Sequence, residues 1–117
     1  MEPSRRTAKH SPEVAQKIAD YHRTVVDDVA AAVETHKVVV VGMAQNPFVK
    51  RARKALTGAN IPFTYLEYGS YLSKWKERLA LKLWASFPTF PMVFVDGALA
   101  GGATDIEKLI EAGKLKA

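Results

Sequence analysis

The most informative stretch of this sequence is Val38-Val39-Val40-Val41-Gly42-Met43-Ala44-Gln45-Asn46-Pro47-Phe48-Val49. It opens with a run of β-branched residues, which predicts a strand that is buried on both faces. Asn46 is a favourable N-cap, and Pro47 fits the first position of a helix that we expect to end at Gly58. The stretch therefore predicts a buried strand, a loop and a helix start, where free N–H groups and the helix dipole attract anions.

Further strands are predicted after this helix. Residues 61–66 would form the second strand, and a strand, a helix and a strand make a βαβ unit with parallel strands and a right-handed crossover. The segments 92–95 and 98–100 flank Asp96-Gly97, which is a strong signal for a tight hairpin turn. We expect both halves to share a four-stranded mixed sheet with helices on its faces.

Apolar spacing predicts helices before, between and after these strands. An N-terminal amphipathic helix over residues 11–36, packed on the domain, is indicated by apolar residues at spacings of three and four: Val14, Ile18, Tyr21, Val25, Val29 and Val33. A helix that begins at Gly69-Ser70 is expected to bury the stripe formed by Leu72, Trp75, Leu79 and Leu83. The pattern Thr104-Asp105-Ile106-Glu107 is that of a capping box, which predicts a last helix that ends at Gly113.

Composition restricts the classes of protein that this chain can belong to. Its 117 residues are 48% hydrophobic and 25% charged, a balance typical of one soluble globular domain. The absence of cysteine excludes disulfides, thiolate metal sites and a thiol nucleophile carried by this chain. Residues 1–10 are polar, and we expect a flexible leader there without a secretion signal. No apolar run approaches the roughly 20 residues of a membrane span, so we expect a cytoplasmic protein.

Positive charge is concentrated in residues 37–117, which hold twelve Lys/Arg against six Asp/Glu within a chain of net charge +5. A basic surface attracts anions of any kind, and it also serves solubility. The run Lys50, Arg51, Arg53 and Lys54 is either a solvated helix face or a site for an anion or acidic partner. No aromatic residue is interleaved with it, which disfavours nucleic acid. The histidines lack metal-ligand spacing, so no metal site is predicted.

Residues 37–115 resemble a glutaredoxin, a member of the thioredoxin-fold superfamily, in three places. Val38–Val41 followed by Asn46-Pro47-Phe48-Val49 is similar to the strand and Cys-Pro-Tyr-Cys motif of that family. Phe87-Pro88-Thr89-Phe90-Pro91 resembles the Trp-Pro-Thr-Phe-Pro segment of monothiol glutaredoxins. Asp96-Gly97 with Gly101-Gly102-Ala103-Thr104-Asp105 resembles their hairpin and Gly-Gly-x-x-Asp signature. The resemblance implies an α/β (α+β mixed-sheet) thioredoxin-like fold, with a glutaredoxin-like domain over residues 37–117 and an extra N-terminal helix.

The resemblance also implies where glutathione would bind. Pro91 would be a cis-proline that faces the site, and backbone groups of Phe90 would meet the cysteinyl part of glutathione. Thr104 and Asp105 would hold the γ-glutamyl end, and Arg78 would pair with the glycine carboxylate. The implied ligand-binding set is completed by Asn46, Phe48 and Thr89.

The departures from the family pattern decide which functions remain. Asn46 and Val49 stand at the two cysteine positions, and Met43 replaces a lysine that would bind a carboxylate, so we assign no catalytic residue. An amide cannot form a thiolate or a mixed disulfide and cannot ligate a cluster, which excludes the ordinary glutaredoxin reaction. The residues favour a redox-inactive module that binds glutathione, as a small anionic thiol, or binds a protein partner. No cofactor is assigned beyond glutathione as the candidate ligand.

Two alternatives stay open at this point. The chain would be a cysteine-independent, glutathione-dependent enzyme of the transferase type if Asn46 oriented a substrate thiol at the helix start, whereas an N-cap role explains the same residue. It would be a pure interaction protein if the N-terminal helix were its contact surface. Arg78 fits a solvated helix face as well as a carboxylate site. The sequence does not predict the oligomeric state.

Overall fold

Helices and strands alternate along residues 8–117, the part of the chain that this computed structural model describes. Their order is α1 (Pro12–Asp20), α2 (Arg23–Thr35), β1 (Val38–Gly42), α3 (Pro47–Gly58), β2 (Thr64–Glu67), α4 (Trp75–Ala85), β3 (Met92–Val95), β4 (Ala98–Gly101) and α5 (Ala103–Glu111). Of the expected leader, residues 1–7 lie outside the described residues, and residues 8–10 form no helix or strand. No helix within residues 8–117 is long and apolar enough to cross a membrane.

The strands form one four-stranded mixed sheet, as the sequence predicts, and their order in the sheet is β2-β1-β3-β4. β1 and β2 are parallel, and β3 is antiparallel to both β1 and β4. The hairpin turn between β3 and β4 has positive φ at Asp96 (50°) and Gly97 (85°), which is what a two-residue turn of this kind requires. β2 begins at Thr64, later than expected, and Pro62 just before it has no N–H to donate to the ladder.

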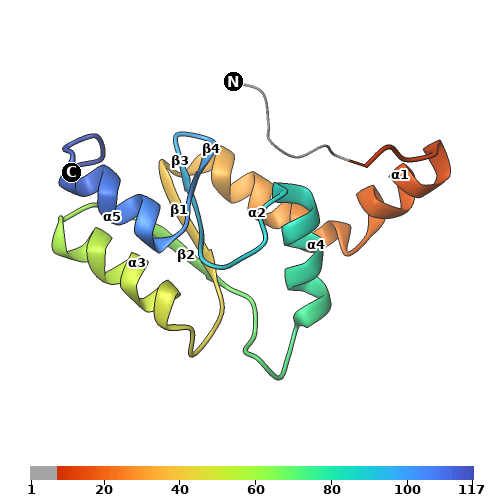
Figure 1. The fold of residues 1–117 in the computed structure, drawn as a ribbon, viewed down its shortest axis with the longest axis horizontal. Helices are drawn as coiled ribbons and strands as arrows, with labels where there is room; N and C mark the ends of the chain where they lie inside the picture. The colour runs from red at the N-terminus through yellow and green to blue at the C-terminus, as the bar shows by residue number, and fades with distance from the viewer. Residues whose placement is uncertain (1–7) are drawn as a thin grey trace.

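β1 is the centre of the core because its valines are buried on both faces of the sheet. Val39 and Val41 pack with α2 and α4 residues such as Val29, Val33 and Leu81. Val38 and Val40 face the other way and pack with α3 and α5 residues such as Ala52, Leu56 and Ile106. Figure 1 shows the resulting three layers, with α3 and α5 on one face of the sheet and α2 and α4 on the other.

The expected single N-terminal helix is in fact two helices, α1 and α2. Tyr21 is extended and His22 has a left-handed backbone with φ of 46°, which ends α1 and changes the direction of the chain. The apolar spacing runs through this break without interruption, so the sequence periodicity does not mark it. The break lets α1 lie beside α4 rather than continue along α2, as Figure 1 shows.

The helix expected from Gly69-Ser70 begins only at Trp75, and its apolar stripe is not buried. Gly69 and Lys74 both have positive φ, so residues 69–74 form a loop. The buried residues of α4 are Arg78, Ala80 and Leu81, whereas the predicted stripe is exposed at every position: Leu72, Trp75, Leu79 and Leu83. The helix therefore turns a different face to the core from the one that its apolar spacing predicts.

Tyr65 on β2 is partly buried and has two charged neighbours, and these surroundings change the pKa of its hydroxyl group. The Arg53 guanidinium lies over its ring, with Cζ 3.9 Å from the ring centroid, and its hydroxyl donates a hydrogen bond of 2.9 Å to Glu67 Oε1. Burial first, and then the hydrogen bond to Glu67, raise the pKa of Tyr65 to about 12.

We predict that the free energy of unfolding falls as pH rises from about 10 to about 12. The unfolded chain releases the tyrosine proton near its ordinary pKa of about 10, whereas the folded chain keeps the Tyr65 proton up to about 12, so unfolding is favoured within this window. Tyr65→Phe has no such proton, and the stability difference between wild type and this variant should shrink through the window. Denaturant unfolding at several pH values measures it, and a constant difference would contradict the prediction.

Candidate functional site

The strand pairing brings three distant segments to one edge of the sheet. Val41 pairs with Met92, so the carboxyl end of β1 lies beside the start of β3. Val93 pairs with Gly101, so the end of β4 and the start of α5 lie at the same edge. The helix start at Asn46 follows β1 directly. Residues near positions 46, 90 and 103 therefore lie close together at this edge of the sheet.

A groove of about 270 Å³ opens at this edge. It is lined by Phe48, Phe87, Thr89, Phe90, Pro91, Gly102, Ala103, Thr104 and Asp105. Six of the eight residues that the resemblance implies for ligand binding line it: Phe48, Thr89, Phe90, Pro91, Thr104 and Asp105. The peptide bond between Phe90 and Pro91 is cis. Most of the implied ligand-binding residues therefore line the groove. The other two, Asn46 and Arg78, are not among its lining residues.

Asn46 caps α3 and uses its side-chain oxygen to do so. Its Oδ1 accepts hydrogen bonds from the backbone N–H groups of Phe48 at 2.9 Å and Val49 at 3.1 Å. These are the N–H groups that would otherwise be free to bind an anion at the helix start. Because both N–H groups already donate to a neutral amide, they are not free to stabilise a substrate thiolate at this helix start.

Val49, at the second cysteine position, is a core residue. It is buried in the cluster around Val41 and Leu81. A Cβ built on Gly42 would lie only 2.7 Å from Val49 Cγ1, so β1 and α3 approach closely here because Gly42 has no side chain. Val49 therefore has a packing role and lies outside the groove lining.

The start of α5 departs from the expected capping box. The N-cap is Gly102 rather than Thr104, and Asp105 Oδ2 accepts a hydrogen bond of 2.9 Å from the Gly102 N–H. Gly101 has φ of +127°, and a Cβ at that position would lie 2.2 Å from Asp105 Oδ2. Gly101 therefore makes room for the Asp105 carboxylate, which is the acidic residue among those that line the groove.

Positively charged groups lie near the groove without lining it. Arg51 Cζ is 5.5 Å from the centroid of the Phe48 ring, and Arg51 forms an ion pair with Glu107 that joins α3 to α5. That hydrogen-bonded pair raises the pKa of Arg51 above its ordinary value. Lys82 Nζ is 5.8 Å from the centroid of the Phe90 ring. Phe87, Arg51 and Lys82 are not among the ligand-binding residues that the resemblance implies, although Phe87 opens the motif that contains Pro91.

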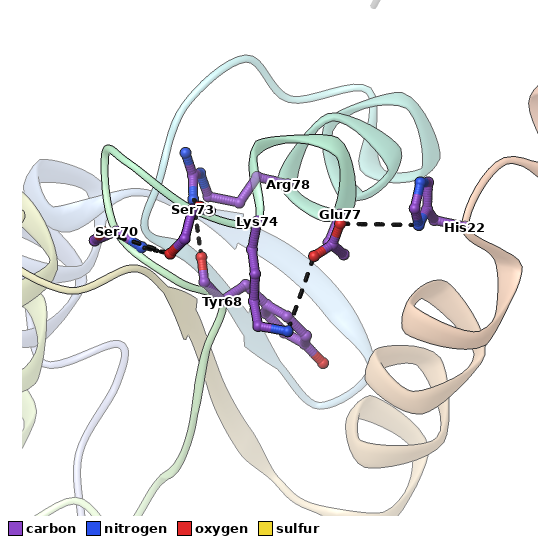
Figure 2. A network of polar contacts seen from close by, with 7 residues as sticks. All are labelled: His22, Tyr68, Ser70, Ser73, Lys74, Glu77 and Arg78. Carbon is purple, nitrogen blue, oxygen red and sulfur yellow. Dashed lines mark hydrogen bonds and ion pairs between the residues drawn. The ribbon is translucent and has the colours of Figure 1, made fainter.

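The structure does not bring Arg78 to the groove. Arg78 is only 8% exposed, and its Nη1 donates to the backbone oxygens of Tyr68 at 3.0 Å and Ser73 at 2.5 Å. Figure 2 shows these contacts together with Glu77, which lies between Lys74 and His22. The guanidinium therefore holds the loop 69–74 against α4, and it lies neither on a solvated helix face nor among the residues that line the groove.

A metal site has no support in the described structure. Within residues 8–117 no three His, Asp or Glu side chains gather closely enough to hold an ion. The chemistry that the groove offers is therefore that of its apolar walls, its backbone groups, Thr104 and the Asp105 carboxylate.

Known proteins of similar sequence share one family name. The chain is 44% identical over 107 residues to a glutaredoxin-like protein of Dictyostelium discoideum, which covers 92% of this chain and 87% of that relative. It is 36% identical over 69 residues to glutaredoxin 4 of Haemophilus influenzae, which covers 59% of this chain and 62% of the relative. No family model matches the chain.

Solved structures of glutaredoxins have a similar fold. A buckwheat glutaredoxin in complex with glutathione superposes with a TM-score of 0.68, over 80% of this chain and 84% of that chain. The two sequences are 20% identical in the superposition. This likeness supports a common thioredoxin-type fold.

We predict that Arg78→Gln lowers the free energy of unfolding by about 1.5–3 kcal/mol, because a buried charged donor to two carbonyls is lost. Arg23→Gln is the matched control, since Arg23 lies largely exposed on α2 and its surface ion pairs are worth about 0–1 kcal/mol. Denaturant unfolding of both variants measures the difference. Unchanged stability of Arg78→Gln together with weaker glutathione binding would show instead that Arg78 is a ligand residue.

Proposed function

The chain belongs to the glutaredoxin family, and we propose that it is a redox-inactive member that binds glutathione, or a related γ-glutamyl compound, in the groove. The observation that carries the proposal is the groove itself, where six residues of the family's binding pattern line one cavity beside a capped, thiol-free helix start. The glutathione found with the buckwheat glutaredoxin supports the choice of ligand. We expect this protein to act in the cytoplasm.

Each part of the groove has a chemical role in this proposal. Backbone groups of Phe90 would pair with the cysteinyl part of glutathione, as in extended peptide recognition. Asp105 would attract the γ-glutamyl ammonium, while one of its oxygens already accepts from the Gly102 N–H. Phe48 is half exposed and would cover the apolar part of the ligand. Asn46 would lie near the ligand's sulfur without reacting with it.

Binding should be weak because carboxylate partners are missing. Met43 is buried where the family carries a lysine, and no Lys or Arg is among the residues that line the groove. One charge-assisted hydrogen bond is worth about 1.5–3 kcal/mol, so its loss lowers affinity by roughly 10- to 150-fold. A weak site of this kind suits a ligand that is abundant.

The transferase alternative has less support from the geometry. Such an enzyme needs free donors at the helix start to stabilise a thiolate, and Asn46 Oδ1 already occupies the N–H groups of Phe48 and Val49. Turnover of glutathione with a reactive aryl halide, absent in Asn46→Ala, would favour this alternative over the proposal.

We predict saturable amide shifts during a glutathione titration followed by backbone NMR. The shifts should cluster at residues 46–48, 90 and 104–105. Asp105→Asn keeps an acceptor for the Gly102 N–H and removes the charge, so it should weaken binding by roughly 10- to 150-fold. Glu111→Gln, an exposed substitution at the other end of α5, is the control and should bind like wild type. Flat spectra at millimolar glutathione would overturn the proposal.

We also predict that Asn46→Cys creates a glutathione-dependent disulfide reductase. The substitution removes the cap oxygen, so the N–H groups of Phe48 and Val49 become free to stabilise a thiolate. Thr57→Cys is the matched control, because it adds an exposed thiol at the far end of the same helix. Reduction of a glutathione mixed disulfide measures both. Equal activity of the two variants would show that the groove does not lie where glutathione binds.

A further inference from the structure

Positive charge on α3 is not balanced by carboxylates of the same helix. The helix carries Lys50, Arg51, Arg53 and Lys54 and no acidic residue. Arg51 is paired with Glu107 on α5, whereas within residues 8–117 the other three cations form no ion pair. Surface charges that serve solubility are usually of both signs, and like charges four residues apart on a helix repel one another. An anion from outside α3 would relieve this repulsion.

The three cations without an ion pair line one hollow. Its volume is about 410 Å³, and no carboxylate is among its lining residues, which are Lys50, Arg53, Lys54, Thr57, Gly58 and Phe63. Positions 50, 53, 54 and 57 are three and four residues apart, so they lie on one face of α3. A hollow lined by charge of one sign concentrates groups of the opposite sign. The hollow is therefore suited to an anionic partner.

This hollow lies beside the edge strand β2. Phe63 immediately precedes β2, and the Arg53 guanidinium lies over the ring of Tyr65 on that strand. In the sheet of the described residues, β2 pairs with β1 alone, so its other edge has no strand partner there. The backbone of an edge strand can pair with an extended peptide from another protein.

The spacing of the cations fits an extended acidic segment. Lys50 and Lys54 are four residues apart, which places them about 6 Å apart along the helix axis. Alternate side chains of an extended chain point to the same side and repeat at about 6.6–6.8 Å. Carboxylates at alternate positions of such a segment therefore match successive cations of α3.

We propose that the hollow between α3 and β2 is a docking site for an extended acidic segment of a partner protein. Its alternate carboxylates pair with Lys50, Arg53 and Lys54, and its backbone lies along the edge of β2. Arg53 already lies over Tyr65, so its charge is positioned before the partner binds. Single-stranded nucleic acid fits less well, because it stacks its bases on aromatic faces, and Arg53 covers a face of Tyr65.

The docking site is independent of the groove that we propose for glutathione. No residue lines both cavities. Failure of either proposal would therefore leave the other standing.

The test is a titration of the full chain with a labelled, end-capped peptide of four alternating Glu-Thr pairs, followed by fluorescence anisotropy. Wild type should bind it saturably, and the affinity should fall as salt rises, because salt screens the charges. A peptide with Gln in place of every Glu should not bind in the same range. A peptide with four Glu followed by four Thr has the same charge without the alternation and should bind more weakly. Amide shifts at residues 63–67 should accompany binding of the alternating peptide.

The variant with both Lys50→Glu and Lys54→Glu should bind the alternating peptide at least about tenfold more weakly, since two attractions become repulsions. Lys76→Glu with Lys114→Glu is the matched control, because it makes the same change of charge at exposed positions outside the hollow. The control should bind nearly like wild type, and circular dichroism should show that both variants are folded.

Three results would overturn the proposal. The first is the absence of saturable binding at low salt up to millimolar peptide, and the second is equal loss of affinity in the two double variants. The third is equal affinity for the alternating and the blocked peptide, which would indicate attraction by charge alone. A single-stranded oligonucleotide that binds more tightly than the peptide, and that the Lys50 and Lys54 substitutions release, would assign the hollow to nucleic acid instead.

Discussion

The burial of β1 on both faces is the constraint on which the rest of the structure depends. A strand whose side chains are apolar on both sides must be covered on both sides, so helices form one layer on each face of the sheet. β1 also sets the position of the groove. Its carboxyl end leads directly to α3, and its pairing with β3 brings Pro91 and the start of α5 to the same edge. The groove is therefore a consequence of how one strand is packed and paired.

Asn46 begins α3 without offering thiol chemistry. Its amide oxygen accepts hydrogen bonds from the two N–H groups that could otherwise stabilise a thiolate, so the helix start is capped and does not attract negative sulfur. Val49 stands at the second cysteine position of the family pattern, and its side chain packs in the core against Gly42. The chain therefore combines a groove at this edge of the sheet with a helix start that carries no thiol.

The structure differed most from expectation around α4 and at the break between α1 and α2. Arg78 donates to the carbonyls of Tyr68 and Ser73, and those contacts hold a loop where the apolar spacing predicted helix. The buried face of α4 consists of Arg78, Ala80 and Leu81, so the apolar stripe that the spacing predicts faces outward. The break at His22 has a comparable origin, since it lets α1 pack beside α4, a contact that is remote in the sequence.

From the sequence came the parallel pair of β1 and β2, the hairpin of β3 and β4, and the helix start at Asn46, whereas the order of the strands came from the structure. The features that came from the sequence follow from contacts between near neighbours and from apolar periodicity, which the residues carry in their own order. The sequence also determined that no thiol chemistry is available, because that depends on composition. The role of Arg78, the direction of α1 and the exposed face of α4 became clear from the folded chain. They depend on contacts that side-chain spacing does not encode: Arg78 donates to two backbone carbonyls of the preceding loop, and α1 packs beside α4.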